Sequence, residues 1–306
     1  MNFLRSLFTL LVFPGLLYAL PMGWLMLGLE RKLRARFQGR LGPPLSQPFY
    51  DVIKLLAKSP VPRMASEKGL LAALPLLALA AMAGALALLP VGAGERGFFG
   101  DLILLVALLE VPPLCLILAG YASRSIYGEV GATREALVSV ACNVPFLAAL
   151  VAMATAAGSL HISRMAIATP WLVRVPALFA ILICLPVKLR LNPFSLANAE
   201  QELLAGPITE FDGPRLALWE LAHALEWVAL TGFVAVLAVP LRSPHGLVNV
   251  LGFVLLSLVL VPVLAALASA TARLKITQAT RLLWHWGSAV ALVALAMALF
   301  FDHGGR

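Results

Sequence analysis

The sequence predicts an all-α fold: a polytopic membrane helical bundle of about eight transmembrane helices plus a short interfacial amphipathic helix. The composition is the first reason, because 61% of the 306 residues are hydrophobic and only 12% are charged. A soluble domain carries roughly 45–50% apolar and about 25% charged residues. This composition excludes a water-soluble protein, a disordered chain and a coiled coil.

The second reason is a series of apolar runs, each near the roughly 20 residues that cross a hydrocarbon core about 30 Å thick. The runs are continuous stretches rich in Leu, Ala and Val, which predicts helices and not the alternating strands of a β-barrel. We expect residues 1–306 to form a single integral membrane domain. The expected spans are 4–28, 70–90, 101–121, 133–157, 171–190, 216–240, 246–269 and 282–301.

The third reason is the distribution of Lys and Arg, which are enriched in the cytoplasmic loops of membrane proteins. Seventeen of the 23 basic residues lie in or beside the loops that follow odd-numbered spans, and six lie on the other face. The loops at about 29–69, 122–132, 191–215 and 270–281 are therefore expected in the cytoplasm, with both termini on the outer face. The net charge of +8 thus reflects topology in a lipid bilayer and not a nucleic-acid partner.

The three cysteines, Cys115, Cys142 and Cys184, lie separately inside apolar runs and form no Cys-x-x-Cys pair. This pattern predicts neither a disulfide scaffold nor a zinc or iron–sulfur site. We therefore expect no metal and no cofactor on this chain.

Charged residues inside spans are costly, and they mark an ion pathway or a buried pair. Glu110 lies near the middle of the third span, just before Pro112-Pro113, which are expected to break the helix and leave carbonyl groups free. Two interpretations stay open at this point. Glu110 is either a proton-carrying carboxylate or a carboxylic acid that is hydrogen-bonded to those carbonyls.

The sixth span carries Glu220, His223 and Glu226 in steps of three, which places them near one helical face. The same Glu-x-x-His spacing occurs in di-iron bundles, but those need matching residues on other helices, and the sequence has no second Glu-x-x-His. A chain of titratable groups is therefore favoured over a metal site. A plain packing role for His223 stays open.

The loop after the fifth span is acidic although basic residues flank it. Leu203, Leu204 and Phe211 are interleaved with the acids, and two Gly-Pro pairs fix the shape of the chain. These features predict a loop that packs against other parts of the protein. Its acids are Glu200, Glu202, Glu210 and Asp212.

Residues 30–43 combine closely spaced Arg, Gln, Gly and Pro, and the spacing of apolar residues in 49–58 suits a short amphipathic helix at the interface. A charge run of this kind can be a simple membrane-flanking anchor. The arrangement favours a docking surface for a cytoplasmic partner. Its candidate residues are Arg34, Arg36, Gln38, Arg40, Asp51 and Lys54.

Three blocks carry a resemblance to a known family: Glu30–Pro43 with Asp51–Leu56 after it, Gly131–Ala136, and Pro193–Gly213. The chain resembles, over nearly its whole length, the family of subunit 1 of respiratory complex I, which is the H-type membrane subunit of bacterial NADH–quinone oxidoreductase. That family includes the matching membrane subunit of energy-converting nickel–iron hydrogenases, such as formate hydrogenlyase. The Gly-Ala-Thr-Arg-Glu-Ala block favours the hydrogenase branch, whereas the Glu-Arg-Lys opening is closer to the quinone branch.

The resemblance implies a non-redox subunit that anchors a cytoplasmic redox arm and holds an acidic path for ions. Expected partners are hydrogenase-like large and small subunits, a ferredoxin-like iron–sulfur subunit and antiporter-like membrane subunits in a prokaryotic cytoplasmic membrane. Iron–sulfur clusters and a nickel–iron centre are expected on those partners, and a quinone only in the quinone branch. The expected proton path is Glu110, Glu135, Glu200, Glu202, Glu210, Asp212, Glu220, His223 and Glu226.

The sequence departs from the family pattern at four positions. Asn143 and Lys188 stand where the family usually has Glu, Ser195 where it has Asp, and Asn198 where it has Glu. We hypothesise that the path is rerouted through Glu110 and the acidic face of the sixth span, or that coupling is poor. A buried pair between Lys188 and an acid is also expected, but the sequence does not identify that acid.

Two alternative functions remain. The first is the quinone-site H-type subunit of a proton-pumping NADH–quinone oxidoreductase. The second is a stand-alone secondary ion transporter, which needs two similar halves with broken helices near the midplane. Pro112-Pro113 has no counterpart in a second half of this sequence.

Overall fold

The computed structural model describes residues 9–59, 68–91, 98–197, 206–240 and 245–304, and every regular element within them is helical. Eight helices there are long and apolar enough to cross a membrane, which confirms the predicted fold class. The elements are α2 (Leu16–Phe37), α3 (Gln47–Leu56), α4 (Lys68–Leu88), α5 (Asp101–Ala122), α6 (Ile126–Ala157), α7 (Ile162–Ala168), α8 (Trp171–Lys188), η1 (Gly206–Glu210), α10 (Gly213–Ala238), α11 (Gly246–Ala270), α12 (Ile276–Leu282), the π-helical turn η2 (Leu283–Gly287) and α13 (Ser288–Gly304).

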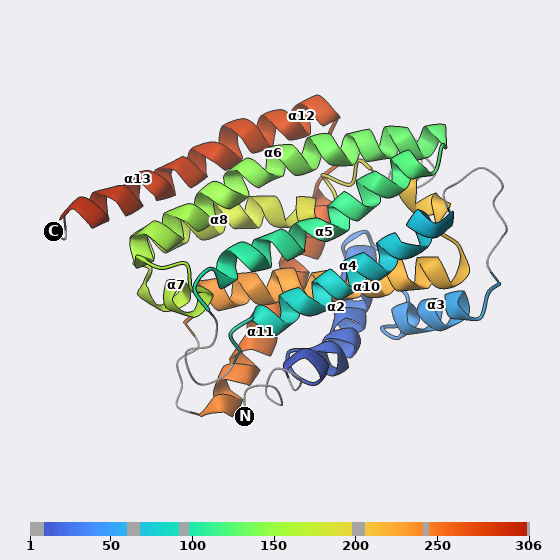
Figure 1. The fold of residues 1–306 in the computed structure, drawn as a ribbon, viewed down its shortest axis with the longest axis horizontal. Helices are drawn as coiled ribbons and strands as arrows, with labels where there is room; N and C mark the ends of the chain where they lie inside the picture. Colours follow the sequence, from blue (N-terminus) through green and yellow to red (C-terminus); the bar gives the residue numbers. More distant parts are fainter. Residues whose placement is uncertain (1–8, 60–67, 92–97, 198–205, 241–244, 305–306) are drawn as a thin grey trace.

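The centre of the bundle is α10, which packs against α2, α4 and α11 and is buried along most of its length. Figure 1 shows α2 and α11 crossing the other long helices at a steep angle. In contrast, α11 exposes Leu251, Leu255 and Val259, which are four residues apart and therefore share one face. An exposed apolar stripe of this kind suits contact with lipid. Charged side chains on α10 are shielded from lipid by the neighbouring helices, whereas charged side chains on the exposed face of α11 would not be.

One end of the bundle gathers α3, the start of α6 and the α12 turn, and the C-terminal end of α13 lies at the opposite end (Figure 1). We call the first of these the α3 end. The short connection from α5 to α6 also lies at that end.

Two of the predicted loops are shorter than expected. The first span does not stop before residue 29, because α2 continues to Phe37, and only Ser123–Ser125 separate α5 from α6. Hydropathy marks where the hydrocarbon ends and not where helical hydrogen bonding ends. At 1.5 Å per residue, the 32 residues of α6 extend well beyond the roughly 30 Å hydrocarbon core.

The expected helix break at Pro112-Pro113 is wrong, because α5 runs without interruption from Asp101 to Ala122 through both prolines. Both proline side chains are buried against neighbouring helices. Packing of this kind lets membrane helices tolerate proline. Glu110 therefore projects from a continuous helix and not from the end of a broken one.

The predicted interfacial helix is confirmed as α3, which spans Gln47–Leu56. Val52 is buried, whereas Phe49, Ile53 and Leu56 are exposed. On the surface of a water-soluble protein, apolar side chains of this kind would face the protein interior. Their exposure suits a helix that lies along the membrane surface at the α3 end.

The close approach of α2 to α10 depends on Gly23, where a Cβ atom would lie 2.3 Å from the carbonyl oxygen of Ala224. We expect Gly23→Ala to lower stability by about 1–3 kcal/mol through overpacking, although alanine is the better helix former. Thermal unfolding of the detergent-purified protein measures this. The matched control is Gly246→Ala, where nothing lies within 4 Å, and equal effects of the two variants would contradict the prediction.

Candidate functional site

A cavity of about 240 Å³ opens at the α3 end among α2, the segment after α8, and α10. Half of its lining residues are ionisable, among them Glu30, Arg34, Arg190, Glu220 and His223, and the other half are Leu, Ile and Trp. Glu30 is almost fully buried and forms an ion pair with Arg34, one turn further along α2. The cavity therefore brings charged groups from the membrane surface into the interior of the bundle.

At the inner side of the cavity lies a cluster of Arg190, His223 and Glu226. The guanidinium of Arg190 forms an ion pair with Glu226, although both side chains are more than nine-tenths buried. His223 Nδ1 lies 3.0 Å from Glu226 Oε2 and 2.9 Å from Arg190 Nη2. The carboxylate is thus held between a permanent cation and a titratable ring.

Trp227 fixes the tautomer of His223. Its indole Nε1–H donates to His223 Nε2 at 3.3 Å, and an indole nitrogen is only a donor. With this hydrogen bond, neutral His223 carries its proton on Nδ1 and directs it at Glu226 Oε2, so the 2.9 Å approach of the Arg190 guanidinium to Nδ1 is a contact and not a second hydrogen bond. A second proton binds at Nε2 only when the Trp227 hydrogen bond is broken.

The position of Arg190 depends on an unusual backbone conformation. After α8, Arg190 takes a left-handed conformation with φ of 54°, where glycine is usual at the end of a helix. A non-glycine residue there costs on the order of 1–2 kcal/mol. The buried contacts with Glu226 and His223 offset this cost, and the turn directs Arg190 toward α10.

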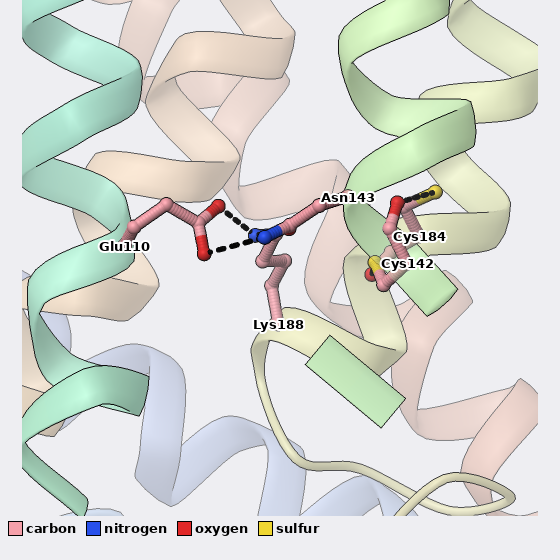
Figure 2. A network of polar contacts seen from close by, with 5 residues as sticks. All are labelled: Glu110, Cys142, Asn143, Cys184 and Lys188. Carbon is pink, nitrogen blue, oxygen red and sulfur yellow. Dashed lines mark hydrogen bonds and ion pairs between the residues drawn. The ribbon is translucent and has the colours of Figure 1, made fainter. Parts of the chain in front are cut away.

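A second cluster lies where α5, α6 and α8 meet. Lys188 forms an ion pair with Glu110, and Asn143 bridges the two by accepting from Lys188 Nζ at 2.6 Å and donating to Glu110 Oε2 at 3.1 Å. Figure 2 shows the three side chains pointing toward one another from separate helices. The Lys188 ammonium also lies 5.1 Å from the centre of the Phe146 ring, close enough for a cation–π interaction.

The contact of α6 with α8 next to this cluster is made by Cys142 and Cys184 (Figure 2). Each thiol donates to the other residue's carbonyl oxygen, at 3.7 and 3.6 Å. Cys184 lies one turn before Lys188, and Cys142 directly precedes Asn143. The cysteines therefore hold the two helices in the register that the Asn143–Lys188 bond requires.

Glu135 connects the two clusters. It is buried on α6 and interacts electrostatically with Arg190, Glu226 and Lys188. The electrostatic interactions of Glu135 thus extend from the groups beside the cavity to the cluster at the middle of α5, and we call this set of groups the polar chain. Five predicted path residues belong to this chain: Glu110, Glu135, Glu220, His223 and Glu226.

The other four predicted path residues belong to the acidic loop. Glu200 and Glu202 lie outside the described residues. Glu210 lies at the end of η1, and Asp212 immediately precedes α10. The structure therefore places the acidic loop at the α3 end only in part.

The predicted docking residues lie together at the α3 end. Arg31 binds Asp51 at 3.1 Å, and Gln47 donates to the same carboxylate at 2.8 Å, so α3 is fixed against α2. The exposed members of the set are Arg36, Gln38, Arg40 and Lys54, and Arg34 lines the polar cavity. The surface they form is continuous with the entrance to the cavity.

Sequence reasoning misses Arg190 and the role of Asn143. It treats Asn143 as a lost carboxylate, and Arg190 only as part of the basic edge of a loop. The motif Lys188-x-Arg190 directly after an apolar span is the available signal, because a cation at such a depth requires a partner. Among the described residues, no group of three or more His, Cys, Asp or Glu could hold a metal ion.

The fold and this polar chain define a multi-pass membrane subunit with buried ionisable groups. The chain belongs to the family described as NADH dehydrogenase, whose model matches residues 9–299. It is 31% identical to Hydrogenase-4 component C of Escherichia coli (strain K12), over 81% of this chain and 82% of that protein. It is 30% identical to the H-type subunit of NADH-quinone oxidoreductase of Bacillus thuringiensis subsp. konkukian (strain 97-27), over 78% of this chain and 75% of that protein.

Among solved structures, the chain is similar to a subunit of the membrane-bound sulfane sulfur reductase, an archaeal respiratory membrane complex. The TM-score is 0.85 at 27% identity, over 97% of this chain and 99% of that one. The chain is therefore a membrane subunit of a complex I-like or hydrogenase-like respiratory complex, and its partners are the other subunits of such a complex.

The mutual dependence of Glu110 and Lys188 can be tested by a double-mutant cycle. Lys188→Met leaves a buried carboxylate without its cation, and we expect a loss of about 3–5 kcal/mol. Adding Glu110→Gln to that variant should recover most of the lost free energy of unfolding. Thermal unfolding in detergent measures both. Lys58→Met, at an exposed site, is the control, and additive losses from the two substitutions would contradict the pairing.

Proposed function

We propose that the chain is the non-redox membrane anchor and proton-path subunit of an energy-converting nickel–iron hydrogenase complex. It docks the cytoplasmic redox arm and couples electron transfer to ion translocation. The observation that carries the proposal is the polar chain that connects the cavity at the α3 end with Glu110 in the middle of α5. Ion pairs at this depth are costly to bury, and ionisable residues inside membrane spans typically mark ion pathways.

The character of the cavity supports the hydrogenase branch over the quinone branch. A quinone needs an apolar, tail-sized opening, whereas this cavity is about 240 Å³ and half of its lining residues are ionisable. Pockets for small organic ligands usually measure roughly 300–1,000 Å³ and are mostly apolar. The 31% identity to Hydrogenase-4 component C agrees with this preference but is nearly matched by the NADH-quinone oxidoreductase relative.

The proposed route begins at Glu220, which lines both the polar cavity and a neighbouring cavity beside Asp51 and Lys54. A proton from the cavity binds His223 at Nε2 and displaces the Trp227 indole. His223 then gives up its Nδ1 proton to Glu226. Glu135 receives the proton next, because it is buried and interacts electrostatically with groups of both clusters.

The route continues at Glu110. Protonation of that carboxylate breaks its ion pair with Lys188, whose ammonium keeps Asn143 Oδ1 and the Phe146 ring as partners. The cluster thereby changes from neutral to positive, and deprotonation of Glu110 resets it. This is the rerouted path that the four departures from the family pattern suggest.

We further propose that the α3 end faces the cytoplasm and that both termini lie on the outer face, as the excess of basic residues there predicts. The redox arm would dock on Arg36, Gln38, Arg40 and Lys54. Iron–sulfur clusters and the nickel–iron centre would sit on the partner subunits. Those partners would be hydrogenase-like large and small subunits, a ferredoxin-like subunit and antiporter-like membrane subunits.

Co-purification tests the branch. We expect the tagged chain, isolated in mild detergent, to bring along nickel–iron hydrogenase subunits, identified by mass spectrometry, and hydrogen-evolving activity. Flavin- and NADH-oxidising subunits without hydrogen evolution would move the assignment to the quinone branch. A chain that purifies alone with ion-flux activity would instead indicate a transporter.

Proton transport tests the route. In inverted vesicles, we expect Glu110→Gln and Glu226→Gln, singly, to lower the protons moved per hydrogen molecule at least tenfold, because a neutral amide does not titrate and removing one positioned proton-transfer group typically costs about 10²-fold. Quenching of a pH-sensitive dye, normalised to hydrogen evolved, gives this ratio. The matched control is Glu129→Gln, an exposed carboxyl at the start of α6. An unchanged ratio in both path variants would overturn the rerouted path.

A further inference from the structure

A second cavity, separate from the polar chain, lies where the start of α6 meets the junction of α11 and α12. Its volume is about 480 Å³. Three cationic side chains line it, namely Arg134, Arg273 and Lys275, together with apolar walls from Leu196 and Ile276. No acidic residue lines it among the described parts of the chain. We call it the basic cavity.

The basic cavity is built by fixed backbone contacts. The Leu274 N–H donates to the Pro193 carbonyl at 3.1 Å, which fastens the α11–α12 junction to the turn after α8. Arg273 Nε donates to Ser195 Oγ at 3.4 Å. This bond uses only Nε, and the terminal amino groups of a guanidinium are suited to bidentate binding of phosphate.

The cavity lies at the level of the membrane surface. The α11 helix spans the bilayer and ends at Ala270, so residues 271–275 emerge at its boundary. Thr133, next to Arg134, is hydrogen-bonded to the exposed Tyr121 at 3.1 Å. Tyrosines at helix ends are typical of the interfacial level, where lipid headgroups lie.

The cationic lining of the basic cavity, its apolar walls and its position at the membrane surface together indicate the occupant. We propose that the basic cavity binds the phosphate headgroup of an anionic phospholipid, with Arg273 and Lys275 on the phosphate and Leu196 and Ile276 against the first part of an acyl chain. Basic pockets between membrane helices are suited to such headgroups, including the doubly charged cardiolipin. The bound lipid would join α6 to the α11–α12 junction, whichever redox arm the complex carries.

Native mass spectrometry of the delipidated complex, reloaded with cardiolipin or with phosphatidylcholine, tests this proposal. We expect selective retention of cardiolipin and a loss of about fivefold for each of Arg273→Gln and Lys275→Gln, since one cation near an anionic lipid contributes about that factor. The matched control is Arg281→Gln, on α12 but outside the cavity lining. It should retain the lipid.

A second variant avoids removing any cation. Ser195→Asp places a carboxylate beside Arg273 Nε, and it should lower cardiolipin retention with an unchanged melting temperature. Equal retention in all variants would overturn the proposal. Competition by inorganic phosphate at concentrations below those of the lipid would assign the cavity to a free anion instead, and release of a partner subunit with lipid retention intact would assign it to protein docking.

Discussion

The constraint on which the rest of this structure depends is that a charge placed inside a bilayer must be paired. Two cations at the end of α8 each meet this constraint by pairing with a carboxylate. Lys188 still belongs to the helix and pairs with Glu110 on α5, whereas Arg190 has left the helix through a left-handed turn and pairs with Glu226 on α10. Two cations that are two residues apart thereby fix α8 between its neighbours on opposite sides. The same two pairs that hold the helices together are the groups on which the proposed proton route depends.

Asn143 and Lys188, two of the positions at which the sequence departs from the family pattern, contact the same carboxylate, Glu110. The family resemblance predicts a carboxylate at each position, and together with Glu110 these would place three acids in one place. Here the amide and the ammonium both bind Glu110, so the cluster is neutral as it stands. A neutral cluster is cheaper to bury than three acids that share a site, and a single proton suffices to change its charge.

The sequence predicts what depends on local composition. The eight spans and the amphipathic α3 follow from hydropathy and spacing, and the structure contains them. The contacts of Glu110 with Asn143 and Lys188 cannot be predicted from hydropathy and spacing, because Glu110 lies 33 residues from Asn143 and 78 from Lys188 in the sequence. Their contact depends on how three helices pack. The turn at Arg190 is also beyond prediction, since neither proline nor glycine marks it and its left-handed φ is stabilised by a tertiary contact.

In the proposed route, the hydrogen bond of Trp227 to His223 would control the entry of protons. While Nε2 accepts from the indole, that nitrogen cannot take a proton from the cavity. Entry therefore requires displacement of a fully buried tryptophan on the central helix, and motion there is coupled to α2 and α4, which pack on α10. Since α2 also carries the basic residues beside α3, a partner that binds this surface acts on the same packed unit. Coupling between a docked redox arm and proton entry then needs no contact between the arm and His223.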